Sequence, residues 1–147
     1  MEFNSEEIHR FWEPYYLDNA ILLKSARLDY PDAYGTFRSA GGSLYLKGLE
    51  HMTAVELLVC LNQLSALSVK KWCDAGFFGN LQLDWEKAYL ASCLMKLKGV
   101  ISPSDEIRAK LHLRRLRRIK NTTFFAFGYS FNDDRFYGDA LFGVKQK

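Results

Sequence analysis

The sequence has few of the residues that build metal centres or disulfide frameworks. Three of its 147 residues are cysteines and three are histidines. Cys60, Cys73 and Cys93 are odd in number, form no CxxC pair and lie at no zinc-site interval from a histidine. We therefore expect no disulfide framework, no metal and a reducing, cytoplasmic compartment.

Long apolar runs and nucleotide-binding loops are missing as well. No apolar stretch reaches the roughly 18 residues that cross a bilayer, and Met1 is followed by acidic residues rather than by a secretory signal. There is no Gly-rich phosphate loop and no GxSxG nucleophile elbow. These absences argue against a membrane protein, a serine hydrolase and a metalloenzyme, and we expect a soluble protein without a cofactor.

Aromatic residues are abundant. They make up 15% of the chain, with eleven Phe and eight Tyr, which favours a sheet-rich protein or one that lines an apolar ligand site; core packing is the simpler explanation. A length of 147 residues with 48% hydrophobic content fits a single domain over residues 1–147. The net charge of +3 is too small to indicate a class of partner.

The hydrophobic pattern predicts a long helix in the middle of the chain. Thr53 and Glu56 have the spacing of a capping box, and the helix continues to about Cys73, a length of roughly 30 Å. Because this helix is apolar on nearly every face, other elements must wrap around it. The Asn62-Gln63 pair inside the apolar run therefore places amide groups in a pocket.

The remaining elements are predicted from alternation, capping and turn residues. Their order, with a long central helix and a closing antiparallel meander, favours an α+β fold in which the helix lies against the sheet. We expect helices over residues 5–12, with Ser5 as the cap, and 84–94, and strands over residues 20–28, 34–38, 43–48, 95–101, 107–113, 125–131 and 136–145.

Two segments carry a family resemblance. Trp12-Glu13-Pro14-Tyr15 and the run from His51 to Leu64, HMTAVELLVCLNQL, resemble the FcoT-like family of acyl thioesterases. The resemblance implies the hotdog fold, in which a curved antiparallel sheet wraps one long central helix. It also implies that protomers pair into a homodimer or a higher homo-oligomer.

The resemblance assigns catalytic roles to Tyr15, Tyr45 and Asn62. A tyrosine can donate its O–H to a thioester carbonyl, and an amide can hold a water molecule. Each residue also has a structural alternative, because tyrosines pack in sheets and a buried Asn often ties backbone groups together. Thr53 stands where the family has Asn, so the N-cap is kept but an amide donor is lost, which bears on substrate choice and on the reaction itself.

The start of the central helix supplies further candidates. His51 lies near the positive end of the helix dipole, which favours its neutral form and makes it a candidate base; a hydrogen-bonded structural His is the alternative. On the hotdog resemblance, backbone N–H groups from His51 to Ala54 bind the thioester oxygen. Glu56 is a candidate general base, although the capping box already explains it, and we group it with Thr53 and Ala54 as substrate-binding.

Two groups of basic residues are candidate anion sites. Arg114, Arg115, Arg117 and Arg118, together with Lys120, suit CoA phosphates or an acidic carrier protein; the alternative is a solvated segment that protects a strand edge. Lys70 and Lys71 complement the dipole at the end of the central helix, and Lys70 is also a candidate for holding a small carboxylate such as that of an amino acid. No nucleic-acid motif accompanies these residues, and we expect neither a nucleic-acid nor a membrane partner.

Three functions follow as hypotheses. The first is hydrolysis of a fatty acyl-CoA or acyl-carrier-protein thioester. The second is addition of glycine to an α,β-unsaturated acyl-carrier-protein thioester, which relatives resembling this family carry out in isonitrile lipopeptide biosynthesis. The third is a non-catalytic subunit that binds an acyl chain or a carrier protein. All three functions require the same binding of a thioester, so the sequence does not distinguish well between them.

Overall fold

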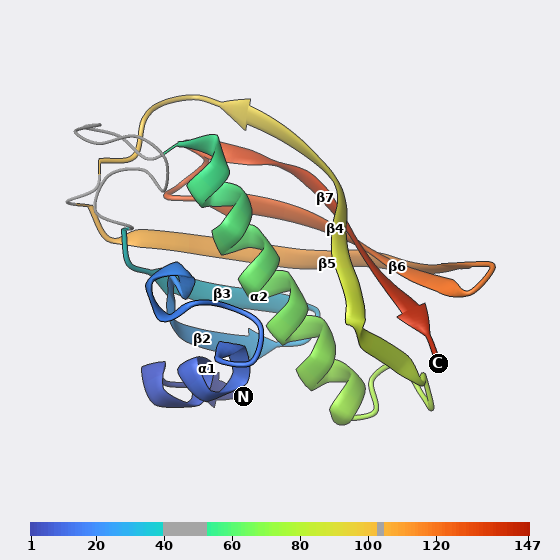
Figure 1. Ribbon diagram of the computed structural model, residues 1–147. Helices are drawn as coiled ribbons and strands as arrows, with labels where there is room; N and C mark the ends of the chain where they lie inside the picture. Colours follow the sequence, from blue (N-terminus) through green and yellow to red (C-terminus); the bar gives the residue numbers. More distant parts are fainter. Residues whose placement is uncertain (40–52, 103–104) are drawn as a thin grey trace.

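One antiparallel sheet forms most of the structure. The computed structural model describes residues 1–39, 53–102 and 105–147. Within these residues seven strands pair in the order β1-β2-β3-β5-β6-β7-β4 (Figure 1). The strands are β1 (Glu2–Phe3), β2 (Leu23–Asp29), β3 (Asp32–Phe37), β4 (Leu83–Leu97), β5 (Ile107–Ile119), β6 (Thr122–Phe131) and β7 (Phe136–Gln146).

A single long helix, α2 (Ala54–Asp74), lies across one face of the sheet (Figure 1). It begins with the capping box predicted from the sequence: the Thr53 hydroxyl accepts from the Glu56 backbone N–H at 3.3 Å, and the Glu56 carboxylate accepts from the Thr53 N–H at 2.9 Å. Just beyond it, Gly76 has a φ of 81°, a left-handed conformation that suits glycine at a helix end. The predicted central helix and the α+β fold class are confirmed.

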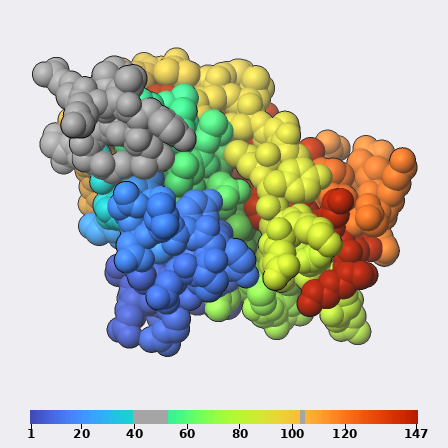
Figure 2. All heavy atoms as spheres, viewed as in Figure 1, coloured from blue at the N-terminus to red at the C-terminus, as the bar shows by residue number. Residues whose placement is uncertain are grey.

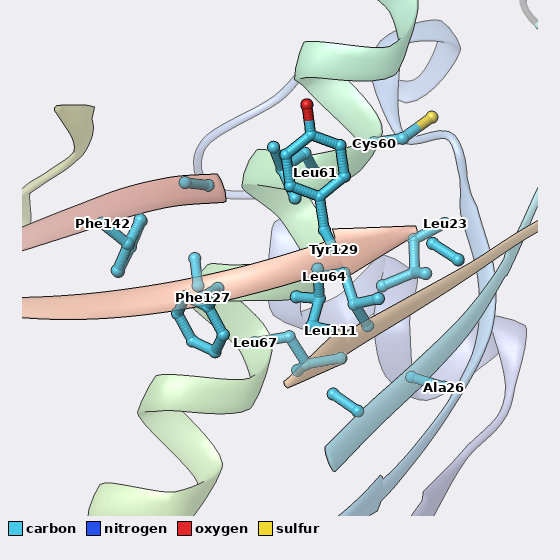
Figure 3. Close-up of a cluster of buried hydrophobic side chains, with 14 of the residues drawn as sticks. Leu23, Ala26, Cys60, Leu61, Leu64, Leu67, Leu111, Phe127, Tyr129 and Phe142 are labelled. Carbon is cyan, nitrogen blue, oxygen red and sulfur yellow. The ribbon is translucent and has the colours of Figure 1, made fainter. Parts of the chain in front are cut away.

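The core lies between α2 and the sheet. Leu61 and Leu64 on the helix meet Leu111 and Phe127 on β5 and β6 in one cluster of buried side chains (Figure 3). Burying each side chain of this size stabilises the fold by about 1.5–3 kcal/mol before entropy is counted. The nearly all-round apolar character of α2 follows from this position, since the sheet and the N-terminal segment cover it on several sides.

The N-terminal segment packs against the same core through a short helix, α1 (Ser5–Trp12). The cap is Asn4 and not Ser5: its side chain accepts from the Glu7 N–H at 3.0 Å, while the Glu7 carboxylate accepts from the Asn4 N–H. Trp12 is buried at the end of α1, and a 3₁₀ turn, η1 (Asp18–Ala20), precedes β2. The segment after Trp12 is thereby held beside α2.

The expected helix over residues 84–94 is wrong. These residues belong to β4, which pairs with β7 from Leu83 opposite Gln146 to Leu97 opposite Phe136. Its register shifts twice, between Asp84 and Ala88 and between Leu90 and Ser92. Each shift breaks the alternation that marks a strand, and the resulting spacing of apolar residues imitates a helix.

The other predicted boundaries differ by smaller amounts. The strand predicted over 20–28 is β2, which begins at Leu23. The strand predicted over 95–101 is the end of β4, and β5 continues past residue 113 to Ile119. The predictions over 34–38, 125–131 and 136–145 correspond to β3, β6 and β7. The strand expected over 43–48 lies outside the described residues. Among those residues, no helix is both long and apolar enough to cross a membrane.

Candidate functional site

A pocket of about 240 Å³ lies where α2 is bordered by the N-terminal segment on one side and β4 on the other. Figure 2 shows α2, in green, reaching the surface between the blue N-terminal segment and yellow β4. A pocket of mixed apolar and polar character is the usual form of a small-molecule site. Its walls are Phe11, Trp12, Tyr15, Tyr16, Asn62, Ala66, Lys70, Trp85, Glu86, Ala88 and Phe142.

Three residues of α2 form the floor of this pocket. Asn62, Ala66 and Lys70 follow one another at intervals of four residues, so they lie along one side of the helix. At 1.5 Å per residue, Asn62 and Lys70 are about 12 Å apart along the helix axis. The small side chain of Ala66 leaves room between the two polar residues, and Trp85 and Phe142 add apolar walls.

A side-chain hydrogen bond forms one polar end of the pocket. The Asn62 amide nitrogen donates to the Tyr16 hydroxyl oxygen at 2.8 Å. Burial raises the pKa of the Tyr16 phenol above its ordinary value, and the hydrogen bond from Asn62 opposes this only in part. Tyr16 is therefore protonated at neutral pH, and its own O–H is available as a donor.

The neighbouring amide, Gln63, has a structural role. Its side-chain oxygen accepts from the backbone N–H groups of Leu22 and Leu23 at 3.0 and 3.1 Å, and its nitrogen donates to the Ala20 carbonyl at 2.7 Å. Gln63 thus ties the start of β2 to α2 inside the core. The amide pair predicted to occupy a pocket divides: Asn62 faces the pocket and Gln63 faces the core.

The other polar end of the pocket is an ion pair beside an indole. The Lys70 ammonium lies 2.5 and 2.7 Å from the two carboxylate oxygens of Asp74, and 5.7 Å from the centre of the Trp85 ring. Lys71 points elsewhere, over the rings of Phe3 and Phe11 at 5.3 and 5.8 Å. Of the two lysines that end the helix, the structure therefore brings only Lys70 to the pocket wall.

The two tyrosines after Pro14 lie in different surroundings. Tyr15 lines the pocket but is 55% exposed, so it lies at the rim. Tyr16 is half-buried and packs edge-on against Trp12, with ring centres 5.1 Å apart. Sequence reasoning missed Tyr16, although its spacing of four residues from the buried Trp12 was a signal that it faces inward. The predicted site residues Tyr45 and His51 lie outside the described residues.

The helix start is separate from this pocket. Glu56 is fully buried, and one of its oxygens accepts from both the N–H and the hydroxyl of Thr53, at 2.9 and 3.1 Å. Its other oxygen has no hydrogen-bond partner among the described residues. Thr53, Ala54 and Glu56 do not line the pocket, and Ala54 is about 12 Å from Asn62 along the helix.

The four arginines lie on the β5–β6 hairpin, away from the pocket. Arg114 forms an ion pair with Asp139, and its guanidinium lies over Gly128, where an added Cβ would come within 2.6 Å of it. Arg115, Arg117 and Arg118 are exposed near the end of the hairpin. The structure therefore separates Arg114 from the other three.

Two of the thiols, those of Cys60 and Cys73, are poor nucleophiles in this fold. Burial raises the pKa of the fully buried Cys60 thiol, and the carboxylate of Glu56 adds to the effect. Burial and Asp74 raise the pKa of Cys73 to about 11. Both are therefore protonated at neutral pH. Within residues 1–39, 53–102 and 105–147, no three His, Cys, Asp or Glu side chains gather in a way that could hold a metal ion.

Comparison with solved structures relates the fold to known proteins. The structure matches a single-residue mutant of the thioesterase PA1618 from Pseudomonas aeruginosa with a TM-score of 0.61, covering 99% of this chain and 96% of that one at 10% identity. The chain has the hotdog fold. S. sahachiroi AziG matches with a TM-score of 0.56 over 85% of this chain and 92% of that one, at 9% identity. No family model and no curated protein matches the sequence.

These likenesses concern the fold alone, because the sequence identities are near 10%. The hotdog architecture expected from the family resemblance is therefore correct. One fold can host unrelated activities, so the function depends on the residues of the pocket and not on the fold.

Proposed function

We propose that this protein is an enzyme that processes acyl thioesters, most directly by hydrolysing a fatty acyl-CoA or acyl-carrier-protein thioester. The observation that carries the proposal is the Asn62–Tyr16 hydrogen bond at one end of a pocket with apolar walls. A thioester has the matching shape, with a polar reacting carbonyl and an apolar chain. The likeness in fold to a thioesterase and the resemblance to the FcoT-like family support the same reaction class.

Tyr16 is the group that stabilises the reacting carbonyl. Its hydroxyl oxygen accepts from Asn62, which directs its own hydrogen away from the amide and leaves it to donate to the thioester oxygen. As water adds to the carbonyl carbon, negative charge develops on that oxygen, and a fixed donor lowers the barrier. Tyr15, at the pocket rim, supplies a second donor.

Asn62 and Glu86 act on the attacking water. The Asn62 side-chain oxygen accepts a hydrogen bond from the water and positions it beside the carbonyl. Glu86 lines the same pocket, and its carboxylate takes the proton that the water loses. The new carbon–oxygen bond replaces the carbon–sulfur bond, and the proton held by Glu86 passes to the departing thiolate. The products are a carboxylic acid and a free thiol, without a covalent enzyme intermediate.

The acyl chain lies along α2 from Asn62 toward Lys70. Ala66 leaves the room for it, and Trp85 and Phe142 cover it with apolar surface. Lys70, held by Asp74, closes the far end. We also propose that two protomers assemble through β4, which forms one edge of the sheet in the described structure. Sizing chromatography that shows a strict monomer would contradict this assembly.

Substitution of Asn62 tests the mechanism. Asn62→Ala removes the group that orients both Tyr16 and the water, so we expect kcat/KM for octanoyl-CoA or an octanoyl-carrier protein to fall about 100-fold. Its side chain makes one hydrogen bond among the described residues, to Tyr16, so the free energy of unfolding should fall by only about 1 kcal/mol. Asn80→Ala, at an exposed position of the loop between α2 and β4, is the control. Unchanged turnover in the Asn62 variant would remove this residue from the mechanism.

Lys70 favours a second candidate reaction, addition of glycine to an α,β-unsaturated acyl-carrier thioester. An ammonium in the pocket wall can bind the carboxylate of an amino acid, in exchange for Asp74. The glycine nitrogen would then bond to the β-carbon, a proton would go to the α-carbon, and the thioester would stay intact.

Intact-mass analysis separates the reactions. The protein is incubated with saturated and α,β-unsaturated acyl-carrier thioesters, with and without glycine. Free carrier thiol in the absence of glycine supports hydrolysis, and a glycine-sized mass gain with the thioester retained supports addition. A thioester that binds and survives for hours supports a non-catalytic binding subunit instead.

A further inference from the structure

The end of the β5–β6 hairpin projects from the sheet. Pairing of β3 with β5 stops where Asp32 lies opposite His112, and the Leu113 N–H bonds to the Pro31 carbonyl at 2.9 Å. Beyond that point β5 pairs only with β6 in the described structure, so one of its edges carries no neighbouring strand. Figures 1 and 2 show this orange hairpin extending past the rest of the fold. We call residues 114–123 the basic arm.

The charge of the basic arm is not balanced by nearby acidic residues. Lys110 and His112, just before it, pair with Asp32, and Arg114 pairs with Asp139. In contrast, Arg115, Arg117, Arg118 and Lys120 are exposed and have no acidic group within 4.0 Å in the described part of the chain. These four positive charges exceed the net charge of the whole protein, +3. The arm therefore presents a concentrated positive field.

The arrangement of these side chains suits a broad partner better than a single phosphate group. A register shift lies between Leu113 and Arg115, after which Arg117 is opposite Phe124 and Arg118 is opposite Thr123. Consecutive residues of a strand point to opposite faces, so these guanidinium groups diverge. From Arg115 to Lys120 the arm covers about 17 Å. Hydrogen-bond donors that bind one phosphate converge on a point. The guanidinium groups of the arm instead spread over the two faces of the hairpin, which matches an extended acidic surface.

Apolar side chains lie between the basic ones. Leu116 is 40% exposed and Ile119 is 45% exposed, which adds apolar contact area to the charged surface. A second copy of the chain is a poor partner at the open edge of β5, because antiparallel pairing of two such edges would place arginine against arginine. The unpaired positive charges and the repulsion between two copies both favour a partner with negative charge.

We propose that the basic arm docks an acidic acyl carrier protein, which brings the thioester to the pocket in preference to free CoA. This inference rests on the proposed function. Its distinguishing property is that the arm acts on the carrier and not on the acyl group, because none of its residues lines the pocket.

Reversing the charge of the arm tests the inference. The variant carries Arg115→Glu, Arg117→Glu and Arg118→Glu, and the control carries Lys24→Glu, Lys98→Glu and Lys147→Glu, which changes the net charge equally at exposed positions outside the arm. Three substrates carry the same octanoyl group, on a bacterial acyl carrier protein, on CoA and on pantetheine. At 50 mM NaCl we expect the arm variant to lose at least about tenfold in kcat/KM with the carrier and less than twofold with pantetheine.

The control variant should retain activity on all three substrates. Raising NaCl to 200 mM should slow the wild type on the carrier substrate and leave the pantetheine substrate unaffected, since screening weakens only the docking. Equal losses on carrier and pantetheine substrates, or no loss on either, would overturn the proposal and leave edge protection as the role of the arm. A triple Arg→Gln variant, which removes the charge without reversing it, replaces the Glu variant if that variant does not fold.

Binding is measured separately, so that failure of the proposed function does not obscure the result. If the wild type turns over no thioester, the proposed function fails, and fluorescence anisotropy with labelled octanoyl carrier protein still tests the docking. Weaker binding by the arm variant supports the inference, and equal binding overturns it. A 20-base-pair duplex that binds the arm while the carrier does not would assign the surface to nucleic acid and would also overturn it.

Discussion

The pocket beside α2 and the basic arm are built in opposite ways. The pocket combines residues far apart in the sequence, from Tyr16 to Phe142, and its polar side chains Tyr16, Asn62 and Lys70 each have a partner inside the protein. The arm consists of nearly consecutive residues whose charges, apart from that of Arg114, have no acidic partner in the described structure. The difference indicates that the pocket is preorganised to bind a small group, whereas the charges of the arm are neutralised by a partner molecule.

The largest effect should follow from cutting the structural tie next to the pocket. Gln63→Leu leaves the N–H groups of Leu22 and Leu23 and the carbonyl of Ala20 without their partner in the core. Unsatisfied buried groups cost about 1–3 kcal/mol each, and with partial relaxation we expect the free energy of unfolding to fall by about 3 kcal/mol. Urea denaturation measures the change.

The matched variant on the arm is Arg117→Ala, which should change the free energy of unfolding by no more than about 0.5 kcal/mol, because the side chain is exposed. A similar loss for both variants would mean that the arm is part of the stable core, which contradicts the distinction between the two regions.

A smaller effect should follow from filling the pocket. Ala66→Leu places extra bulk on the α2 stripe between Asn62 and Lys70, so the ratio of kcat/KM for long to short acyl chains should fall about tenfold. The matched control is Ala126→Leu on β6, where Ala126 pairs with Arg115 of the arm; this substitution should leave the ratio unchanged. Turnover of acyl-pantetheines of increasing length measures it. An unchanged ratio in the Ala66 variant would show that the chain does not lie along α2.

The smallest expected effect is that of alkaline pH on the pocket donor. Because burial raises the pKa of Tyr16 above its ordinary value, the phenol keeps its proton throughout the neutral and mildly alkaline range. The kcat/KM for octanoyl-pantetheine should therefore show no falling limb from Tyr16 between pH 7 and about 9.5. A decline in this range that disappears in Tyr16→Phe would show that the phenol ionises more easily than its surroundings imply.

The central helix was predictable because its signals are local. The capping box of Thr53 and Glu56 uses residues three positions apart, and the apolar run after it is uninterrupted, so α2 was found within a residue at each end. The alternation in β6 was equally local. In β4, by contrast, two register shifts hide the strand period, and only the pairing with β7 establishes the strand.

The pocket was predictable only in part. The sequence singled out Asn62, Lys70 and Tyr15, and in the structure all three line the same pocket. It did not single out Tyr16, Trp85 or Glu86, because each reaches the pocket through packing between elements that are distant in the chain. Nor could it separate Asn62 from Gln63, since neighbouring amides have the same chemistry and differ only in the side of the helix they occupy.

The sequence by itself determined the α+β class, the position and cap of α2 and the cluster of basic residues, because these depend on periodicity, short-range capping and composition. Tertiary structure alone decided that β4 is a strand, that Gln63 holds the core while Asn62 faces a pocket, and that three of the four arginines extend beyond the sheet while Arg114 is paired. Such outcomes depend on which distant segments meet, and a contact between distant segments leaves no periodic trace in the chain.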